Sequence, residues 1–531
     1  MNKRFIFLLA STAALCCGCS CSGNINVLSK YETNGSSLNI ASDAFTRYDI
    51  SYDMTNLNSF LVKLINSIKS QNLNDIKKHA GQVAAEAALL DDKATFAIIK
   101  YYSHPTEESK SDYDELKNKF NSYYVKYMEA CDEAKKTGNQ EIIDFIVGKN
   151  RILPSDPQRE VELSKIMEDY NEAAEELYNN KGAYSKEQFS KEALKMFLEY
   201  APYCDEYASL FEYEDYLNYS YKHVYNRGYT PADSRNLTDL VKTIIAPKYK
   251  PFDFSKYGIS TISKIINAST MPFCTKSLGL GKNLDDYASY VGGDYLDVYK
   301  NCFTSGYFIF SNDPKSMATA ATCDLNYNSN GGILYFSKDY QNYSTIIHEF
   351  GHYYSFRING LSMSKSYDLN ETFSQGNEML FSSYLLNNEK DGFYEGIANL
   401  TIDSFYKSLL TIAYSVDIEN YLFSNYKTKS IDEMYSYIVN LYNSYNVSDI
   451  PSEYWVYPVL VNTGYYISYA TSIVESLEIL SLANEDFGKA FGAYHSLIAQ
   501  KEILSEVAAW EKAGLTSPFK EQTIRKIANY F

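Results

Sequence analysis

The chain has little histidine, a shortage of positive charge and few cysteines. Six His occur among its 531 residues, and 49 basic residues face 66 acidic ones, for a net charge of −17. This acidic balance argues against nucleic acid as a partner and against binding to an anionic membrane surface through charge. The five Cys beyond residue 21 are widely spaced and form no CxxC pair, so we expect mostly buried thiols rather than a disulfide framework.

Long apolar runs are also missing, with one exception near the N-terminus. A basic pair precedes an apolar run at residues 5–15, which is too short to span a bilayer and is typical of an export signal. The Gly-Cys step at Cys19 resembles a bacterial lipoprotein processing site, with Cys17 as the alternative lipidated residue. We expect residues 1–19 to be a lipoprotein-type signal peptide, and an ordinary secreted protein cleaved nearby is the alternative.

Three further regions follow from composition and spacing. Residues 20–42 are rich in Ser, Asn and Gly, which predicts a flexible tether. Residues 43–245 carry apolar residues at helical spacing, as between Leu57 and Leu61, and predict an N-terminal helical region. A Pro-containing break then begins the third region, 246–531, which holds the chemistry described next.

The most informative stretch is the HExxH motif that begins at His348. On a helix, His348 and His352 lie at i and i+4, so both imidazoles leave one face and can share a metal ion. Glu349 lies beside them and can take a proton from a water that the metal activates. Glu371 can supply a third ligand, and this set describes a catalytic zinc site with one Zn²⁺ per chain. The alternative is a helix with two exposed His and a solvated Glu.

The residues after the motif narrow the class of zinc site. Glu378 follows Glu371 by two helical turns, where a carboxylate can orient a ligand His; the alternative is an exposed helix Glu. A metzincin would need Gly and His where this chain has Ser355 and Ile358. The aminopeptidase N type shares the spacing from HExxH to Leu-Asn-Glu, but its Gly-x-Met-Glu-Asn element is absent from this sequence.

The C-terminal half resembles the thimet oligopeptidase and oligopeptidase F family of zinc metallopeptidases, which are gluzincins. Besides HExxH and its two glutamates, three segments follow the family's order. Tyr295–Tyr299 with Ser305–Tyr307 resembles its DVY…SGAY stretch, Gly331–Phe336 its substrate-binding edge strand, and Gly464–Tyr469 its C-terminal tyrosine motif. Together they cover roughly residues 290 to 475, and the N-terminal half matches only in being helical.

The resemblance implies a mainly α fold, with two helical lobes that flank a deep channel and a small β-sheet beside the zinc helix. It implies that the edge strand binds extended peptide by strand addition, which reads backbone rather than side chains. The substrate-binding residues would be Gly332, Ile333, Leu334 and Tyr335. It also implies a phenol donor to the developing oxyanion. Tyr469 is the first choice and Tyr466 the second, and the alternative is that both are ordinary helix-face aromatics.

Two departures from the family are visible. The gap from the zinc helix to Glu371 is a few residues shorter than the family's. The family also places a His shortly before the tyrosine motif, where this chain reads Tyr457-Pro458-Val459-Leu460. That His helps to stabilise the transition state in relatives, so its absence bears on activity or specificity.

We therefore expect a zinc metalloendopeptidase, an oligopeptidase that is exported, lipid-anchored in the bacterial cell envelope and active on short unfolded peptides. Two other functions stay open. A lipid-anchored peptide-binding protein is favoured by the missing His, whereas the intact Glu349 argues against it, because a binder needs no base. A gluzincin aminopeptidase would need an acidic anchor for the substrate's N-terminal amine, and the sequence reveals none.

Overall fold

The protein is described by a computed structural model that covers residues 50–530 with internal gaps. The gaps are 149–151, 271–279, 305–307, 312, 314, 317–319, 324–332, 338–342, 360–365, 390, 446–450 and 501–504. The predicted leader and tether, with Cys17 and Cys19, therefore lie outside the described residues, as do Ser305–Tyr307 and Gly332. Within the covered ranges, no helix combines the length and apolarity that crossing a membrane requires.

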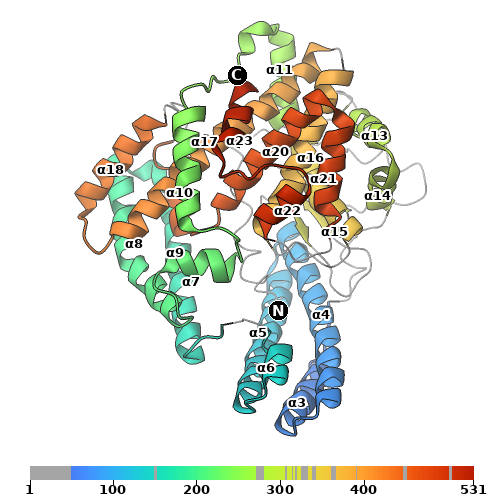
Figure 1. Cartoon of the computed structure of the whole chain (residues 1–531), viewed down its shortest axis with the longest axis vertical. Helices are drawn as coiled ribbons and strands as arrows, with labels where there is room; N and C mark the ends of the chain where they lie inside the picture. Colours follow the sequence, from blue (N-terminus) through green and yellow to red (C-terminus); the bar gives the residue numbers. More distant parts are fainter. Residues whose placement is uncertain are drawn as a thin grey trace. The chain divides into compact units, whose positions relative to one another are not determined.

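The fold is mainly helical, as predicted, with one small sheet in the described part of the chain (Figure 1). The described residues form two compact units. The first unit takes its residues from Leu153–Thr270 and Ser362–Phe531, and the second from Ser20–Ile152 and Met271–Leu361. Each unit thus combines segments that are distant in sequence, and the predicted limits of the regions stay a prediction. Cys131, Cys204 and Cys302 are buried, as expected.

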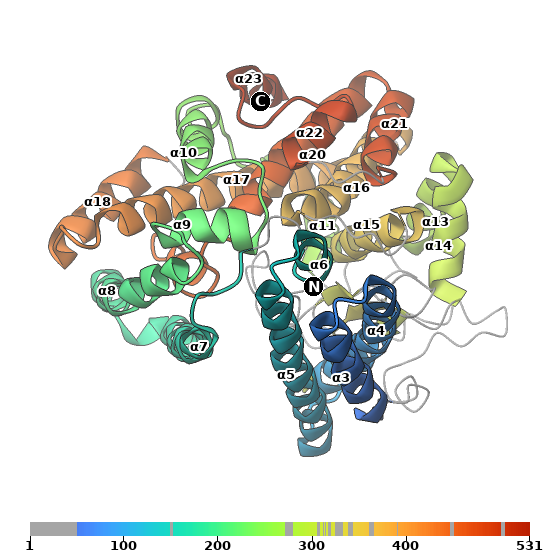
Figure 2. The same ribbon diagram turned by 60° about the horizontal axis from the view of Figure 1, so that its bottom comes forward.

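In the second unit, the first four helices lie side by side in both views (Figures 1 and 2). They are α3 (Thr55–Lys69), α4 (Leu73–Ser103), α5 (Glu107–Lys136) and α6 (Gln140–Ile146). Helix α3 buries an apolar face at three- and four-residue spacing, formed by Leu57, Leu61, Leu64 and Ile68. Removal of such faces from water drives the packing of these helices. Thr106 begins α5 with a capping box that satisfies backbone N–H groups.

The rest of the second unit contains the sheet and the HExxH helix. Its elements are α13 (Leu280–Val291), α14 (Gly293–Thr304), β1 (Phe308–Phe310), β2 (Ala320–Cys323), β3 (Ile333–Phe336) and α15 (Tyr343–Asn359). The strand order is β1-β3-β2, with β3 parallel to β1 and antiparallel to β2. Helix α15 packs against β2, β3 and α14. The small sheet beside the HExxH helix is therefore as predicted.

The prediction that Ile333–Phe336 forms an edge strand is wrong. This segment is β3, and it pairs with Phe308–Phe310 on one side and Ala320–Cys323 on the other. Because its backbone groups bond to neighbours on both sides, β3 leaves no edge to which a peptide strand could be added. Tyr335 is buried, and its hydroxyl donates to the Tyr102 carbonyl at 3.1 Å. In the described sheet, the edge positions belong to β1 and β2.

The first unit is helical throughout its described part. Its α-helices are α7 (Pro157–Asn179), α8 (Lys186–Ser209), α9 (Tyr216–Tyr219), α10 (Pro231–Leu240), α11 (Ile259–Thr270), α16 (Tyr367–Asn388), α17 (Gly392–Asn425), α18 (Ile431–Ser444), α19 (Val456–Leu460), α20 (Ile467–Glu485), α21 (Phe487–Ile498), α22 (Glu506–Lys512) and α23 (Glu521–Ile527). Short 3-10 and π segments are η4 (Lys181–Ala183), η5 (Ser220–Val224), η6 (Val241–Ile245), η7 (Phe254–Lys256) and η9 (Ala528–Tyr530). These elements pack around α16, α17 and α20.

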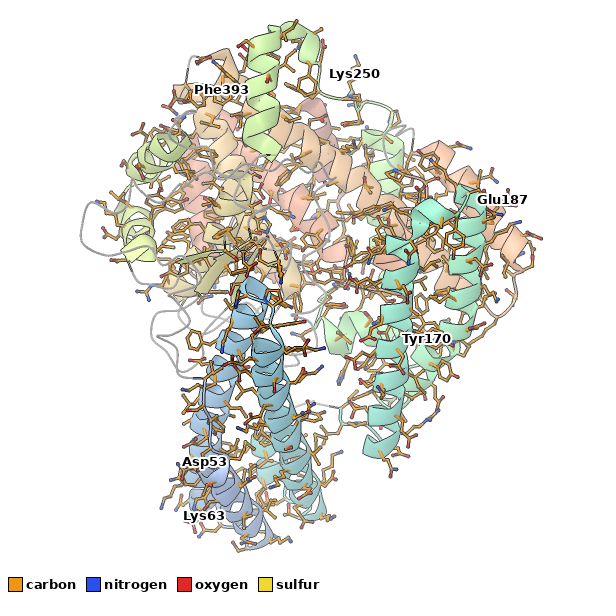
Figure 3. All side chains as sticks on the ribbon, turned by 180° about the vertical axis from the view of Figure 1, so that it is seen from behind. Asp53, Lys63, Tyr170, Glu187, Lys250 and Phe393 are labelled. Atoms are coloured by element: carbon orange, nitrogen blue, oxygen red, sulfur yellow. The ribbon has the colours of Figure 1, made fainter. Side chains whose placement is uncertain are left out.

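Helices α7 and α8 form one wall of this unit, and Figure 3 labels a residue on each, Tyr170 and Glu187. The Tyr170 ring lies 5.7 Å from the Tyr200 ring of α8. On the outer face, Lys191 pairs with Glu187 at 2.9 Å and with Asp432 of α18 at 2.8 Å. Exposed pairs of this kind contribute only about 0–1 kcal/mol each, so aromatic contacts such as that between Tyr170 and Tyr200 contribute more to the packing of these helices.

Helix α16 runs through the centre of the first unit and has almost no exposed face. Of its residues between Asp368 and Leu385, all but one are buried. Its main partner is α20, which is also buried over most of its length. At Gly376 an added Cβ would lie 3.1 Å from side-chain atoms of Ile479 and Tyr494, so the absence of a side chain there allows close packing of α16 against its neighbours.

Glu475 of α20 is fully buried, and neither of its carboxylate oxygens has a hydrogen-bond partner among the described residues. Burial, and then the nearby Glu478, raises the pKa of Glu475 well above its ordinary value of 4.5. The folded state therefore keeps a proton that the unfolded chain releases, and the free energy of unfolding falls as the pH rises above the unfolded pKa.

We predict that Glu475→Met raises the free energy of unfolding by about 1–3 kcal/mol at pH 8, because it removes an unsatisfied buried polar group. The gain should be smaller at pH 5, where ionisation no longer opposes folding. Urea midpoints of variant and parent at both pH values provide the measurement. Glu475→Gln is the control, since it removes the ionisation but keeps a polar group. A loss of stability at both pH values would contradict the prediction.

Candidate metal centre

Helix α15 buries one face and presents the HExxH residues on the other. Ile346, Ile347 and Phe350 are each 3% exposed. His348 and His352 are partly exposed, and their ring centroids lie 5.1 Å apart. The helix is therefore amphipathic in the way that the spacing predicts, with both imidazoles on the same side.

The stretch that resembles the family's DVY segment lies on α14 and packs behind α15. The rings of Tyr295 and Tyr299 lie 5.2 and 5.6 Å from the ring of Phe350. The Tyr354 hydroxyl of α15 donates to Asp294 at 2.9 Å. Buried aromatic contacts of this size contribute strongly to packing, so this segment fixes the back of the HExxH helix.

Helix α16 carries Glu371, whose side chain is buried at 7% exposure. Two hydroxyl groups donate to its carboxylate. Ser374 donates to Oε2 at 3.3 Å, and Tyr465 donates to Oε1 at 3.3 Å. The carboxylate is thus oriented from both of its oxygens by residues of the same unit.

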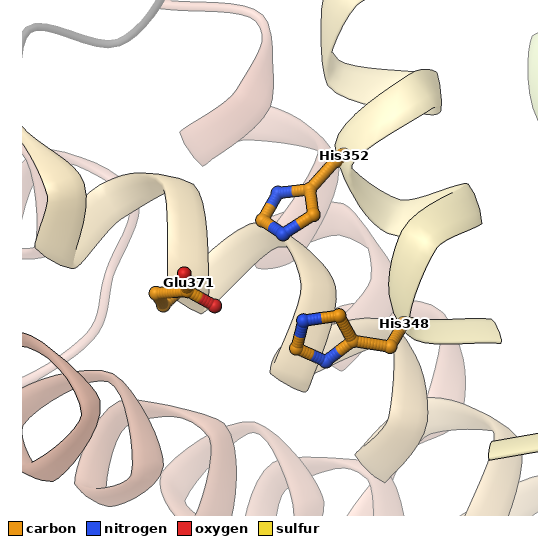
Figure 4. A group of neighbouring side chains, drawn as sticks. All are labelled: His348, His352 and Glu371. Atoms are coloured by element: carbon orange, nitrogen blue, oxygen red, sulfur yellow. The ribbon is translucent and has the colours of Figure 1, made fainter. Parts of the chain in front are cut away.

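His348, His352 and Glu371 come together as one group, and their ligand atoms all lie within 4.8 Å of one another (Figure 4). Each residue offers one atom, so the donor set is two imidazole nitrogens and one carboxylate oxygen. Zn²⁺ binds this set in catalytic sites and keeps a fourth position for water or substrate. The donor set therefore fits a catalytic divalent metal, and it argues against two unrelated exposed His.

The other two glutamates of the predicted centre are also buried. Glu349 and Glu378 are each 7% exposed. The interpretation of Glu378 as an exposed helix Glu is therefore wrong. Its role in orienting a ligand His, and the role of Glu349 as base, stay predictions.

The tyrosine motif forms a turn that leads into α20. Gly464 has a φ of +76°, and an added Cβ would overlap the Ser220 hydroxyl, so glycine is required there. Tyr465 follows in the turn, while Tyr466 and Tyr469 lie at the start of the helix. All three tyrosines are buried.

The structure brings a tyrosine to Glu371 that the sequence reasoning missed. The hydroxyl of Tyr465 contacts Glu371 and also lies 3.2 Å from the hydroxyl of Tyr469. Burial, Tyr469 and Glu371 raise the pKa of Tyr465 well above its ordinary value of 10.0. Burial also raises the pKa of Tyr466 in this way, so both phenols keep their protons and can donate. The catalytic roles of Tyr469 and Tyr466 stay predictions.

The helical architecture of this chain is the helical metallopeptidase fold. The His-His-Glu group is the kind of metal-binding set that such a fold carries. Among solved structures, PZ peptidase A with an inhibitor is similar, with a TM-score of 0.67 and 10% identity over 92% of this chain and 98% of that chain. A Bacillus anthracis protein named as an oligoendopeptidase F gives a TM-score of 0.63 and 13% identity over 91% and 96%. Metallocarboxypeptidase 1 of Trypanosoma cruzi gives 0.51 and 12% over 89% and 98%.

No protein-family model matches the sequence, and no curated protein matches it. At identities of 10–13% the likeness shows the fold alone.

We predict that Glu371→Gln weakens Zn²⁺ binding by more than about 100-fold, because it removes a charged ligand, whereas Glu378→Gln weakens it by about 10- to 100-fold. Competition with a chromophoric chelator measures both constants. The two variants make the same chemical change one and three turns into the same buried helix. Equal losses would contradict the assignment of Glu371 as ligand and of Glu378 as the carboxylate that orients a ligand His.

Proposed function

We propose that this chain is a zinc-dependent metallopeptidase that hydrolyses short unfolded peptides. One observation carries the proposal: His348, His352 and Glu371 group their ligand atoms within 4.8 Å on a helical metallopeptidase fold. Glu349 beside the two imidazoles adds the base that hydrolysis needs and that simple metal storage does not.

His348, His352 and Glu371 would hold the zinc, which when bound supplies a Lewis acid that lowers the pKa of water toward neutrality. Glu349 would take a proton from the attacking water and deliver it to the leaving amine. A phenol would donate to the oxyanion that develops on the scissile carbonyl. Tyr469 remains the first choice for that donor and Tyr466 the second, since Tyr465 already donates to Glu371.

Cleavage inside the peptide is our preferred form of the activity. The similar structures with the higher TM-scores include an oligoendopeptidase F, and the sequence resembles the same family. A carboxypeptidase is the second candidate, because the Trypanosoma cruzi metallocarboxypeptidase shares the fold at a TM-score of 0.51. Capture of peptides without cleavage is the third candidate. It is favoured by the absence of the family's His near Pro458, because that His helps to stabilise the transition state in relatives.

We predict that peptides blocked at both ends and internally quenched are cleaved by residues 24–531 in the presence of Zn²⁺. Glu349→Gln should lower the rate by about 10²- to 10⁴-fold, because the base is lost, while the zinc content of the protein stays at one per chain. Fluorescence gives the rate, mass spectrometry the cleaved bond, and metal analysis the zinc content.

Each other outcome identifies a different function. Cleavage only of peptides with a free C-terminus would indicate the carboxypeptidase. Bound zinc and tight peptide binding without cleavage would indicate the capture protein. Hydrolysis at the parent rate in Glu349→Gln would exclude Glu349 as the base.

We also propose that the protein is exported and anchored to a membrane of the bacterial cell envelope by a lipid on Cys19. The proposal is supported by the basic and apolar residues before Cys19 and by the Gly that precedes it. The tether at residues 20–42 would separate the lipid from the folded chain.

We predict that the full chain, expressed in a bacterial host, incorporates an alkyne-tagged fatty acid and that Cys19→Ala abolishes this label. Cys21→Ala is the matched control and should keep it, because residue 21 lies beyond the processing site. Fluorescence after conjugation of the alkyne provides the measurement. Loss of the label in Cys17→Ala but not in Cys19→Ala would identify Cys17 as the lipidated residue. An unlabelled parent chain would exclude the lipid anchor.

A further inference from the structure

Arg227 is a fully buried cation in the first unit, just beyond the π segment η5. Its guanidinium lies over three tyrosine rings, with centroids at 4.6 Å for Tyr221, 4.3 Å for Tyr225 and 5.7 Å for Tyr229. A buried guanidinium is unfavourable unless its N–H groups are met and its charge is paired. The acceptors of these N–H groups therefore indicate the role of Arg227 in the fold.

The guanidinium bonds mainly to the turn of the tyrosine motif. Nη1 donates to the Gly464 carbonyl at 2.6 Å, and Nη2 donates to the Tyr465 carbonyl at 3.3 Å. On the other side of the same turn, the Gly464 N–H donates to Glu419 Oε1 at 2.6 Å. Two buried ionisable side chains, Arg227 and Glu419, thus fix the backbone from which the Tyr465 ring departs.

The charge of Arg227 is paired with Asp368, and both side chains are 0% exposed. Asp368 lies on α16 one turn before Glu371. Besides Arg227 Nε at 3.4 Å, its carboxylate accepts from three hydroxyl groups. These donors are Tyr229 at 2.6 Å, Ser468 at 2.6 Å and Thr471 at 2.7 Å.

The bonds to the tyrosine turn and the bonds to Asp368 both act on the contact between Tyr465 and Glu371. Arg227 holds the backbone of Tyr465, and through Asp368 it holds the turn of α16 that precedes Glu371. The Tyr465 hydroxyl and the Glu371 carboxylate, which are 3.3 Å apart, are therefore set from both sides by one guanidinium. Ser468 joins the two halves, because its hydroxyl accepts from Arg227 Nη2 at 2.7 Å and donates to Asp368.

We propose that Arg227 is a positioning residue of the metal centre, which acts through Tyr465 to hold the Glu371 carboxylate in its ligand orientation. This inference rests on the proposed function only in that Glu371 binds a metal. Hydrogen-bond donors to a ligand change metal affinity by about 10- to 100-fold when they are removed. A buried ion pair, by contrast, is a weak source of stability relative to apolar residues.

The test is a double-mutant cycle between Arg227→Lys and Tyr465→Phe, with the dissociation constant of Zn²⁺ as the readout. Lysine keeps the charge but lacks the planar fork that bonds to two carbonyls and a carboxylate. Tyr465→Phe removes only the hydroxyl. Each single variant should weaken Zn²⁺ binding about 10-fold or more. The double variant should lose no more than the larger single loss, because both changes break the same connection.

A control separates positioning from general loss of stability. Lys242 forms another ion pair of the first unit with the buried Asp417 at 3.1 Å, and Asp417 also accepts from Tyr445. Asp417→Ala removes the acceptor of Tyr445 and one partner of Lys242, so it should lower the melting temperature without a change in Zn²⁺ affinity. If Arg227→Lys does not fold, Ser468→Ala replaces it in the cycle, because it removes the bridge and keeps both charges.

The affinity can be measured whether or not the protein cleaves peptides, so the two hypotheses fail separately. Unchanged Zn²⁺ affinity in folded Arg227→Lys, or fully additive losses in the cycle, would overturn the positioning role and leave the peptidase proposal intact. A parent chain that binds Zn²⁺ and cleaves nothing would overturn the peptidase proposal and leave the positioning role intact. A parent chain that binds no Zn²⁺ would overturn both.

Discussion

The first unit depends on one constraint: helix α16 carries carboxylates through a buried region, and each needs hydrogen-bond donors from other residues. Asp368 and Glu371, one turn apart, meet this need in different ways. Asp368 accepts from Arg227 and three hydroxyl groups, whereas Glu371 accepts from Ser374 and Tyr465. Because buried polar groups are unfavourable unless they are satisfied, these bonds specify one register of α16 against the tyrosine turn and α20.

The parts of the centre that could be predicted from sequence depend on spacing within a single helix. The i, i+4 imidazoles and the buried apolar face of α15 follow from helix geometry alone, and His348 and His352 lie on one side of the helix as that spacing predicts. Glu371 joins them from a second helix, α16. The prediction of an edge strand was wrong because the order of strands depends on which segments pair, and the sequence of Ile333–Phe336 does not show which segments these are. Its unbroken apolar run is nevertheless typical of a strand buried on both faces, and this signal was available.

Arg227 and Tyr465 could not be found in the same way, since their importance arises from contacts between distant parts of the chain. Arg227 and Asp368 are 141 positions apart, and neither has a distinctive sequence neighbourhood. Tyr465 had one local signal, the preceding Gly464, whose left-handed backbone directs the chain out of a helical path. That signal marks a turn, but it does not show which of the nearby tyrosines reaches Glu371.

The buried carboxylates of α16 and α20 differ in their hydrogen-bond partners. This difference decides whether a carboxylate changes the stability of the fold or the positions of its neighbours. Glu475 has no partner among the described residues and raises the free energy of the folded state when it ionises. Asp368 has four donors, so its charge is tolerated but gives little net stability beyond what apolar residues would give. A fully satisfied polar network does restrict the positions of the groups it joins. In this chain those groups include the hydroxyl that donates to Glu371. If Glu371 binds the metal as proposed, the network acts where the placement of a ligand matters more than the stability of the core.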